Sequence, residues 1–265
     1  SARQRVEDLL AGADAQGYAF WIGAADEALV DAAAFTSPFV QIAVVDSDAE
    51  RIDRLRRRLD AAGLYGKVTA HHAEPAAFKP PRYVAHLVVV GREMTATMDA
   101  ALIRNMYEAV RPYGGVLQLL AEANQQEVAA LVKSLHLEQA QVQLTEQGVL
   151  VRREGALPGS ADWTHQYGDV ANTIKSDDSR VKLPLGILWF GGSSNLDVLP
   201  RHGHGPPEQV VGGRLFIQGM NSLSARDVYT GRVLWKRDFD NLGTFDVYFD
   251  DTYEDTPLDP NYNQV

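Results

Sequence analysis

Cysteine is absent from the 265-residue sequence. This absence excludes disulfides, zinc sites built from thiolates, thiol nucleophiles and thioester chemistry, and it leaves the redox compartment open. Long apolar runs are missing too. No stretch approaches the ~18 consecutive apolar residues of a membrane-spanning helix, and the N-terminal SARQRVEDLL lacks the apolar run of a signal peptide. We therefore expect no membrane span.

Positive charge is scarce as well. Lys and Arg number 25 against 35 Asp and Glu, giving a formal net charge of −10. A surface of this sign repels nucleic-acid phosphates, so we expect no nucleic-acid partner. The one basic run, Arg54 to Arg58, lies among Ile52, Leu55 and Leu59 at helical spacing. We interpret these arginines as the solvated face of an amphipathic helix rather than an anion-binding patch.

The organisation of the chain is that of two unlike domains. Gly, Pro and Ser in EGALPGSAD, residues 154–162, are typical of a linker. We expect one domain at 1–153 and another at 163–265, each able to bury a core. The sequence begins without Met and ends without an evident closing element, so we expect it to be a piece of something longer.

The first part has the pattern of an α/β domain. Three strongly apolar runs, 39–45, 84–90 and 116–120, alternate with helical stretches, as buried parallel strands do. A shorter run at 18–23, followed by the Ala-rich 25–35, predicts a first strand, a turn and a helix. The expected architecture is a doubly wound, mostly parallel, Rossmann-like sheet.

Asp46 ends the second of these strands and has two interpretations. At the switch point of a doubly wound sheet, an acidic side chain can accept hydrogen bonds from a ribose diol. Alternatively Asp46, with Ser47 and Asp48, caps the helix predicted at 48–61. Both remain open from the residues alone.

Three segments of the first part resemble class I S-adenosylmethionine methyltransferases. AVVDSDAERIDRLRRRLDAAGLYGKVTAHHAEP is similar to the family's second strand, helix and third strand. RNMYEAVRPYGGVLQLL resembles its helix, Pro-Gly turn and fifth strand, with Tyr113 inserted before Gly114. QVQLTEQGVLVRR resembles the antiparallel hairpin that closes the sheet. The resemblance covers about residues 15–153. It implies S-adenosylmethionine as cofactor, with Gly23, Asp46 and Glu74 around it.

Departures from the family pattern bear on activity. The loop after the first strand is normally Gly-rich so that backbone can approach the ligand, but residues 21–27, WIGAADE, keep only Gly23. After the fourth strand, VGREM has no recognisable base-methylation motif. Glu93 there is either a general base or a solvated carboxylate. His71 and His72 are adjacent in a strand and point to opposite faces, so we expect no chelation of one ion.

The second part has an all-β pattern, with short strands predicted in GILWFGG, GRLFIQG and GRVLWKRDF. LSARDVYTGRVLWKRD resembles the repeat of pyrroloquinoline-quinone-type β-propellers, Ala-x-Asp-x-x-Thr-Gly-x-x-x-Trp. The matching residues are Ala225, Asp227, Thr230, Gly231 and Trp235. We expect hydrogen bonds from the Asp and Thr within a turn, a tight conformation at the Gly, and packing of the Trp between blades.

This second resemblance implies the opening blades of a propeller. A closed ring needs about four to eight blades, so the remaining blades must come from the same longer gene product or another chain. Trp163 and Tyr167 are expected to be packing residues of the opening segment. The resemblance also implies a periplasmic or extracellular location and pyrroloquinoline quinone as a candidate cofactor.

Two further segments carry candidate ligands. His202 and His204 in RHGHG lie on one side of an extended strand and are candidate metal ligands, the alternative being loop packing. The acidic C-terminal stretch around Asp250 to Asp259 offers oxygen ligands for calcium, but its spacing does not match an EF-hand, and a solvated loop is the alternative.

Three functions follow as hypotheses. The first is an active methyltransferase with its cofactor bound by Gly23, Asp46 and Glu74. The second is a degenerate, non-catalytic domain that gives a propeller protein a binding or scaffold role. The third is part of a quinoprotein alcohol or sugar dehydrogenase. We favour the second, because the cofactor loop has lost its glycines and because S-adenosylmethionine is a cytoplasmic metabolite.

Overall fold

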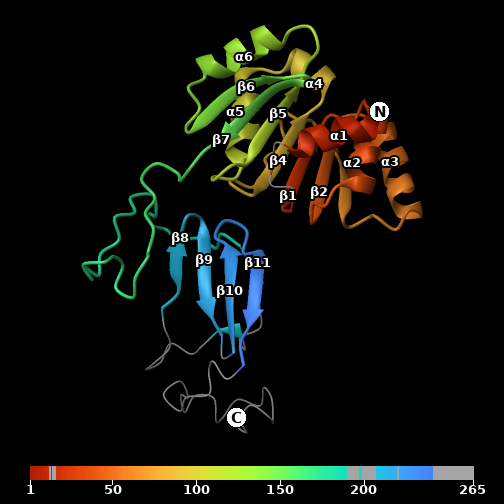
Figure 1. The fold of residues 1–265 in the computed structure, drawn as a ribbon. Helices are drawn as coiled ribbons and strands as arrows, with labels where there is room; N and C mark the ends of the chain where they lie inside the picture. Colours follow the sequence, from red (N-terminus) through yellow and green to blue (C-terminus); the bar gives the residue numbers. More distant parts are fainter. Residues whose placement is uncertain (12, 14–15, 190–196, 199–206, 220, 241–265) are drawn as a thin grey trace. The chain divides into compact units, whose positions relative to one another are not determined.

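The computed structural model describes residues 1–11, 13, 16–189, 197–198, 207–219 and 221–240 (Figure 1). The chain divides into two compact units, Ser1–Gly155 and Ala156–Val265. The predicted linker, 154–162, spans this boundary. Each unit has a sheet of its own.

The sheet of the first unit has seven strands in the order β3-β2-β1-β4-β5-β7-β6. Strands β1 to β5 are joined by parallel pairings, and β7 pairs antiparallel with both β5 and β6, so six of the seven strands run in the same direction. This confirms the mostly parallel, Rossmann-like sheet. The strands are β1 (Tyr18–Ile22), β2 (Gln41–Asp46), β3 (Val68–His72), β4 (Ala85–Val90), β5 (Val116–Leu120), β6 (Ala140–Thr145) and β7 (Gly148–Arg153).

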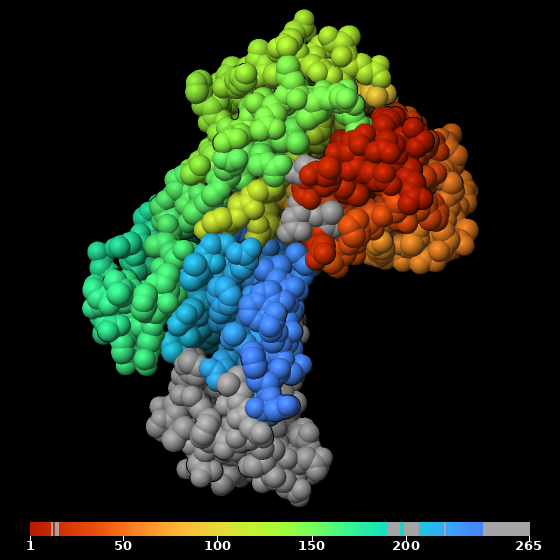
Figure 2. Space-filling view, viewed as in Figure 1, coloured from red at the N-terminus to blue at the C-terminus, as the bar shows by residue number. Residues whose placement is uncertain are grey.

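Helices cover both faces of this sheet and bury two separate apolar clusters. One cluster joins the sheet to α1 (Ala2–Ala11), α2 (Glu27–Thr36) and α3 (Ala49–Ala61). The other joins it to α5 (Ala100–Ala109) and α6 (Gln125–Ser134). The short α4 (Arg92–Thr97) follows β4. The red and orange atoms of α1 to α3 form a broad part of the surface in Figure 2. With both faces covered, β4 is buried along its whole length, which explains why its sequence is apolar except for the buried His86.

The carboxyl ends of β1, β2 and β4 meet at one edge of the sheet. Ile22 pairs with Val45 of β2 on one side and with Val90 of β4 on the other. The chain leaves β1 toward β2 and later returns to pair β4 with the opposite side of β1. This edge is therefore the switch point, where doubly wound sheets bind ligands.

The β6–β7 hairpin closes the sheet by inserting β7 between β5 and β6. Its first residue in β7, Gly148, has φ +146°, and a Cβ there would lie 2.0 Å from the Leu119 carbonyl oxygen and 2.7 Å from the Ala121 nitrogen. Both neighbours are backbone atoms of β5 and its exit. The close approach of the two strands therefore requires glycine.

We predict that Gly148→Ala lowers the free energy of unfolding by about 2–4 kcal/mol, because the added methyl group overlaps backbone that cannot move aside. Gly63→Ala is the matched control. Gly63 also has a positive φ, +67°, but nothing lies within 4 Å of its Cβ position, so the expected loss is about 1 kcal/mol. Urea denaturation followed by circular dichroism measures both. Equal losses would contradict the packing argument.

The second unit contains a four-stranded antiparallel sheet in the order β11-β10-β9-β8. Its strands are β8 (Gln209–Val211), β9 (Arg214–Gln218), β10 (Ser222–Asp227) and β11 (Val233–Asp238). The strands predicted in GRLFIQG and GRVLWKRDF are thus present as β9 and β11. A ring of several such sheets stays a prediction.

The strand predicted in GILWFGG is wrong for its described part, residues 186–189. Ile187 is 83% exposed and Leu188 59% exposed, and no strand in the described part of the chain pairs with them. An apolar extended segment without a neighbouring ladder forms no sheet. Trp189 packs against a turn instead, as described below.

Candidate functional site

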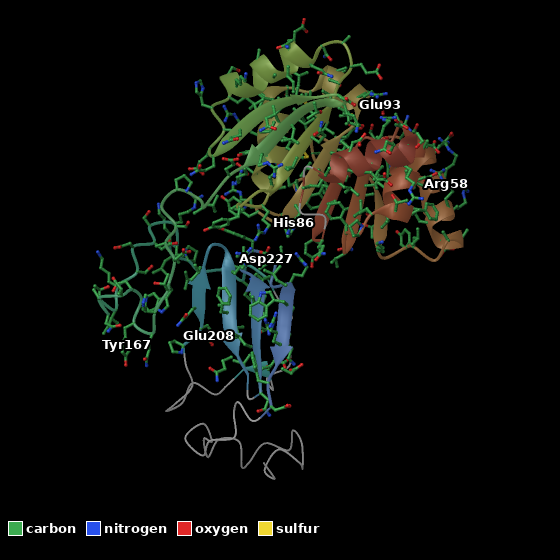
Figure 3. All side chains as sticks on the ribbon, in the orientation of Figure 1. Arg58, His86, Glu93, Tyr167, Glu208 and Asp227 are labelled. Carbon is green, nitrogen blue, oxygen red and sulfur yellow. The ribbon has the colours of Figure 1, made fainter. Side chains whose placement is uncertain are left out.

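A cavity of about 400 Å³ opens at the carboxyl ends of β1, β4 and β5. Its floor is apolar, and charged side chains stand at its rim. The lining residues are Trp21, Gly23, Ala25, Asp26, Leu29, Gly91, Arg92, Glu93 and Leu120. Figure 3 labels Glu93 at the start of α4. Of the three predicted cofactor residues, only Gly23 lines this cavity; Asp46 and Glu74 do not.

The carboxylate of Asp46 is buried at the end of β2 and accepts three hydrogen bonds from the protein itself. Oδ2 accepts from the Ala24 amide at 2.6 Å and from the Arg51 guanidinium at 2.8 Å. Oδ1 accepts from the Asp48 amide at 2.7 Å. Asp46 is not the N-cap of α3; that residue is Asp48, whose side chain accepts from the Arg51 amide. Through these hydrogen bonds, Asp46 holds the loop after β1 and the start of α3 against the end of β2.

Arg51 forms ion pairs with three carboxylates at the switch point, those of Asp46, Asp48 and Glu93. Its Nη1 lies 2.8 Å from Asp46 Oδ2 and 3.1 Å from Glu93 Oε1. Burial alone would lower the pKa of the guanidinium, but the hydrogen bond to Asp46 and the charges of Asp46 and Glu93 outweigh it and raise the pKa. Glu93, which the sequence left open as either a general base or a solvated carboxylate, forms an ion pair with Arg51. Arg51 thus links α3, the end of β2 and the start of α4.

Gly23 has a left-handed backbone conformation, and the Met94 side chain packs against it. Its φ is +83°, and a Cβ at this position would lie 2.6 Å from Met94 Cγ. The Met94 side chain therefore occupies the space that the missing Cβ leaves. Backbone bonds hold the loop in place: Gly23 donates to the Val45 carbonyl at 2.8 Å, and Gly91 donates to the Ile22 carbonyl at 2.7 Å.

Glu74 and the two histidines lie in exposed positions around the end of β3. The Glu74 carbonyl accepts from the amides of Ala77 and Phe78, so its backbone starts a turn. His71 bonds Thr69 Oγ1 at 3.0 Å, whereas His72 bonds the Ser47 carbonyl at 3.1 Å. The two histidines thus have different partners. The structure places neither them nor Glu74 beside the cavity.

The acidic residues of the β1 loop have structural partners. Asp26 is the N-cap of α2 and pairs with Arg5 of α1 at 2.9 Å. Glu27 accepts from Arg54 and Arg58, and the hydrogen bond from Arg54 lowers the pKa of Glu27. The arginine run is therefore not simply solvated, because part of it holds α3 against α2.

The three predicted cofactor residues have different surroundings at this edge. The Asp46 carboxylate is bonded to the chain's own donors, Met94 lies over Gly23, and Glu74 is exposed. What the arrangement leaves open is the apolar-floored cavity between β1, β4 and β5. Arg51 and Met94 are the residues that sequence reasoning missed. The available signal was their position, in the first turn of a helix directly after a strand of the switch point.

In the second unit, the predicted propeller motif forms a tight turn between β10 and β11. Asp227, labelled in Figure 3, is fully buried and accepts from the Tyr229 amide at 2.8 Å. Thr230 Oγ1 accepts from the Arg232 amide at 3.3 Å. Gly231 has φ +70° and donates to the Asp227 carbonyl at 2.8 Å. Ala225 is fully buried in β10. The hydrogen bonds expected of this turn are present.

Three tryptophans contact or belong to this sheet. Trp189 donates from Nε1 to the Val228 carbonyl at 2.9 Å, and its ring stands 2.3 Å from where a Gly231 Cβ would lie. Trp163 pairs with Val210 of β8 through two backbone bonds of 2.9 Å. Trp235 is 38% exposed and Tyr167 is 48% exposed. The role of Trp235 between blades stays a prediction.

The remaining candidate ligands fall outside what the structure describes. His202, His204 and the acidic residues from Asp250 to Asp259 belong to the segments left out of the description. Within the described ranges, no group of three or more His, Asp or Glu side chains is placed to hold a metal ion. Nor does any helix of those ranges combine the length and apolarity needed to cross a membrane.

No family model matches the chain, and no curated protein matches it. Among solved structures, it is similar to a provisionally assigned S-adenosyl-L-methionine-dependent methyltransferase from Methanococcus maripaludis (TM-score 0.46, 13% identity, 57% of this chain and 82% of that chain). A SAM-dependent methyltransferase from Aquifex aeolicus gives a TM-score of 0.47 and 10% identity, over 58% of this chain and 89% of that one. A provisionally assigned sarcosine dimethylglycine methyltransferase from Galdieria sulphuraria gives 0.42 and 10%, over 53% and 60%.

The first unit has a Rossmann-like sheet, whose seven strands are mostly parallel and end in an inserted antiparallel hairpin. At these TM-scores and identities, the likeness to the solved structures carries no activity to this chain.

We predict that Asp46→Asn lowers the free energy of unfolding by about 2–3 kcal/mol, because the amide offers one acceptor oxygen where three donors converge and loses the charge that Arg51 needs. Glu93→Gln removes the other carboxylate of the same network, at a side chain 46% exposed, and should cost less than about 1 kcal/mol. Thermal and urea unfolding of both variants measure the two losses of stability. A loss at Glu93 equal to that at Asp46 would contradict this ranking.

Proposed function

We propose that the chain has a binding or scaffold role, in which a degenerate methyltransferase-like domain accompanies the first blade of a quinoprotein-like propeller. The observation that carries the proposal is the state of Asp46. Its buried carboxylate is bonded to Ala24, Asp48 and Arg51 of the same chain. These three hydrogen bonds stabilise the switch point, and they leave the Asp46 carboxylate with few acceptor positions for the hydroxyls of a ribose.

The β1 loop supports the same conclusion. A loop that binds a nucleotide closely needs several positions without a Cβ, and here only Gly23 remains, under Met94. The two acidic residues that follow are N-cap and ion-pair partners of neighbouring helices. The loop is therefore built to hold helices together.

Features of the second unit support the proposal that it is a propeller blade. A four-stranded antiparallel sheet of consecutive strands is the unit from which propellers are built. Trp189 packs on the Gly231 turn of this sheet, whereas Trp235 on β11 is exposed. We propose that Trp235 makes the corresponding contact with a turn of the next blade. A propeller of this kind would also favour a periplasmic or extracellular location.

The proposal predicts that the protein does not bind S-adenosylmethionine. Titration calorimetry at about 1 mM ligand, where a Kd in the millimolar range would still give measurable heat, should show no saturable signal, and S-adenosylhomocysteine should behave alike. Methyl transfer to protein or small-molecule acceptors should be absent as well. Saturable binding would instead favour the active methyltransferase.

The proposal that the second unit is a propeller blade is tested by counting repeats in the natural gene product. We expect its complete reading frame, or that of a partner chain which co-purifies with it, to contain about three or more further Ala-x-Asp-x-x-Thr-Gly-x-x-x-Trp repeats, because a closed ring needs at least about four blades. A native assembly without any further repeat would refute the propeller while leaving the conclusion about the first unit intact.

A further inference from the structure

We propose that Arg51 is the residue that excludes a nucleoside from the end of β2, and that removing it opens a diol-binding carboxylate at Asp46. The inference rests on the proposed function, since it explains why the first unit does not bind a nucleoside cofactor. It goes further by assigning that exclusion to one side chain.

The first step is a count of acceptor positions. A carboxylate can accept about four hydrogen bonds. In Asp46 three are in use, two by the amides of Ala24 and Asp48 and one by Arg51. A ribose diol that donates both hydroxyls to one carboxylate needs two positions. The wild-type chain leaves about one, and loss of Arg51 leaves about two.

The second step is the location of the guanidinium. Nη1 of Arg51 lies between Asp46 and Glu93, within 3.1 Å of an oxygen of each. The Asp46 side chain is 4% exposed and that of Arg51 is 21% exposed. Arg51 therefore neutralises the carboxylate, and any ligand hydroxyl that bonds Asp46 has to compete with a charge-assisted bond.

Two hydrogen bonds to Asp46 remain when Arg51 is removed. The two amide bonds to Asp46 come from backbone fixed by the β1 loop and the start of α3, so the carboxylate keeps its orientation. It is then a buried charge without a cation, which makes new donors favourable. A diol is such a donor, and the sheet edge at a switch point is where it would approach.

Arg51→Met is the informative variant, because it keeps an aliphatic side chain of similar length for packing and removes the charge. Arg54→Met is the matched control. It lies on the same helix, loses the same charge, and pairs with Glu27 of α2 rather than with Asp46. Thermal unfolding establishes that each variant is folded before binding is measured.

The probe is adenosine, titrated up to about 5 mM by calorimetry, with 2′,3′-dideoxyadenosine as the ligand that lacks the diol. We expect no saturable heat with the wild type or Arg54→Met, and a Kd of about 1 mM or lower with Arg51→Met. The dideoxy compound should bind at least about tenfold more weakly, because hydrogen bonds to a charged group are lost. Adding Asp46→Asn to Arg51→Met should abolish the gain.

The outcomes separate the two proposals. Diol-dependent adenosine binding by the wild type would overturn both this inference and the proposed function. A folded Arg51→Met variant that binds no adenosine, or binds the dideoxy compound equally well, would overturn the inference alone. If Arg51→Met does not fold, Arg51→Ala serves in its place, because it also removes the guanidinium from Asp46 and Ala has the highest helix propensity; adenosine affinity no higher than that of the wild type would then count against the inference.

Discussion

The bonded carboxylate of Asp46 is the interaction on which the switch point of the first unit depends. It sits where three segments distant in sequence converge: the loop after β1, the start of α3 and, through Arg51, the start of α4. Backbone bonds from Gly23 to Val45 and from Gly91 to Ile22 complete the same edge. A sheet edge usually left free for a ligand is here cross-linked by the chain itself.

The second unit repeats this principle at a smaller scale. Asp227, fully buried, accepts from the amide of Tyr229 and so fixes the turn between β10 and β11. Gly231 gives the turn its left-handed residue, and Trp189 covers it. In both units a buried aspartate at the end of a strand accepts hydrogen bonds from nearby backbone amides, as buried polar groups require.

The sequence predicted the architecture of the first unit well, because parallel strands buried on both faces produce unmistakable apolar runs. The run 116–120 coincides with β5, and 84–90 contains β4. The prediction of a strand around Trp189 was wrong, since the apolar residues there pair with no strand in the described part of the chain. Short apolar runs do not by themselves distinguish a strand from an extended segment.

The site was harder to predict. Asp46 was identified as the key acid, but its partner was not, because Arg51 belongs to a helix whose charges have the pattern of a solvated face. Side chains of a helix tilt toward its N-terminus, so a residue in the first turn points back over the preceding strand end. Met94 reaches Gly23 from the first turn of α4. Sequence spacing alone does not reveal such tertiary contacts.

The insertion of β7 between β5 and β6 has a consequence for how the protein is made. The edge strand β6 is synthesised before its inner neighbour, so β6 has no strand of the sheet to pair with until residues 148–153 have emerged. The sheet is completed only by its last strand, through contacts that span long sequence separations and therefore form slowly. The next unit begins at Ala156. Since domains generally fold as units during synthesis, the first unit becomes competent to fold almost at the moment when the second starts to appear.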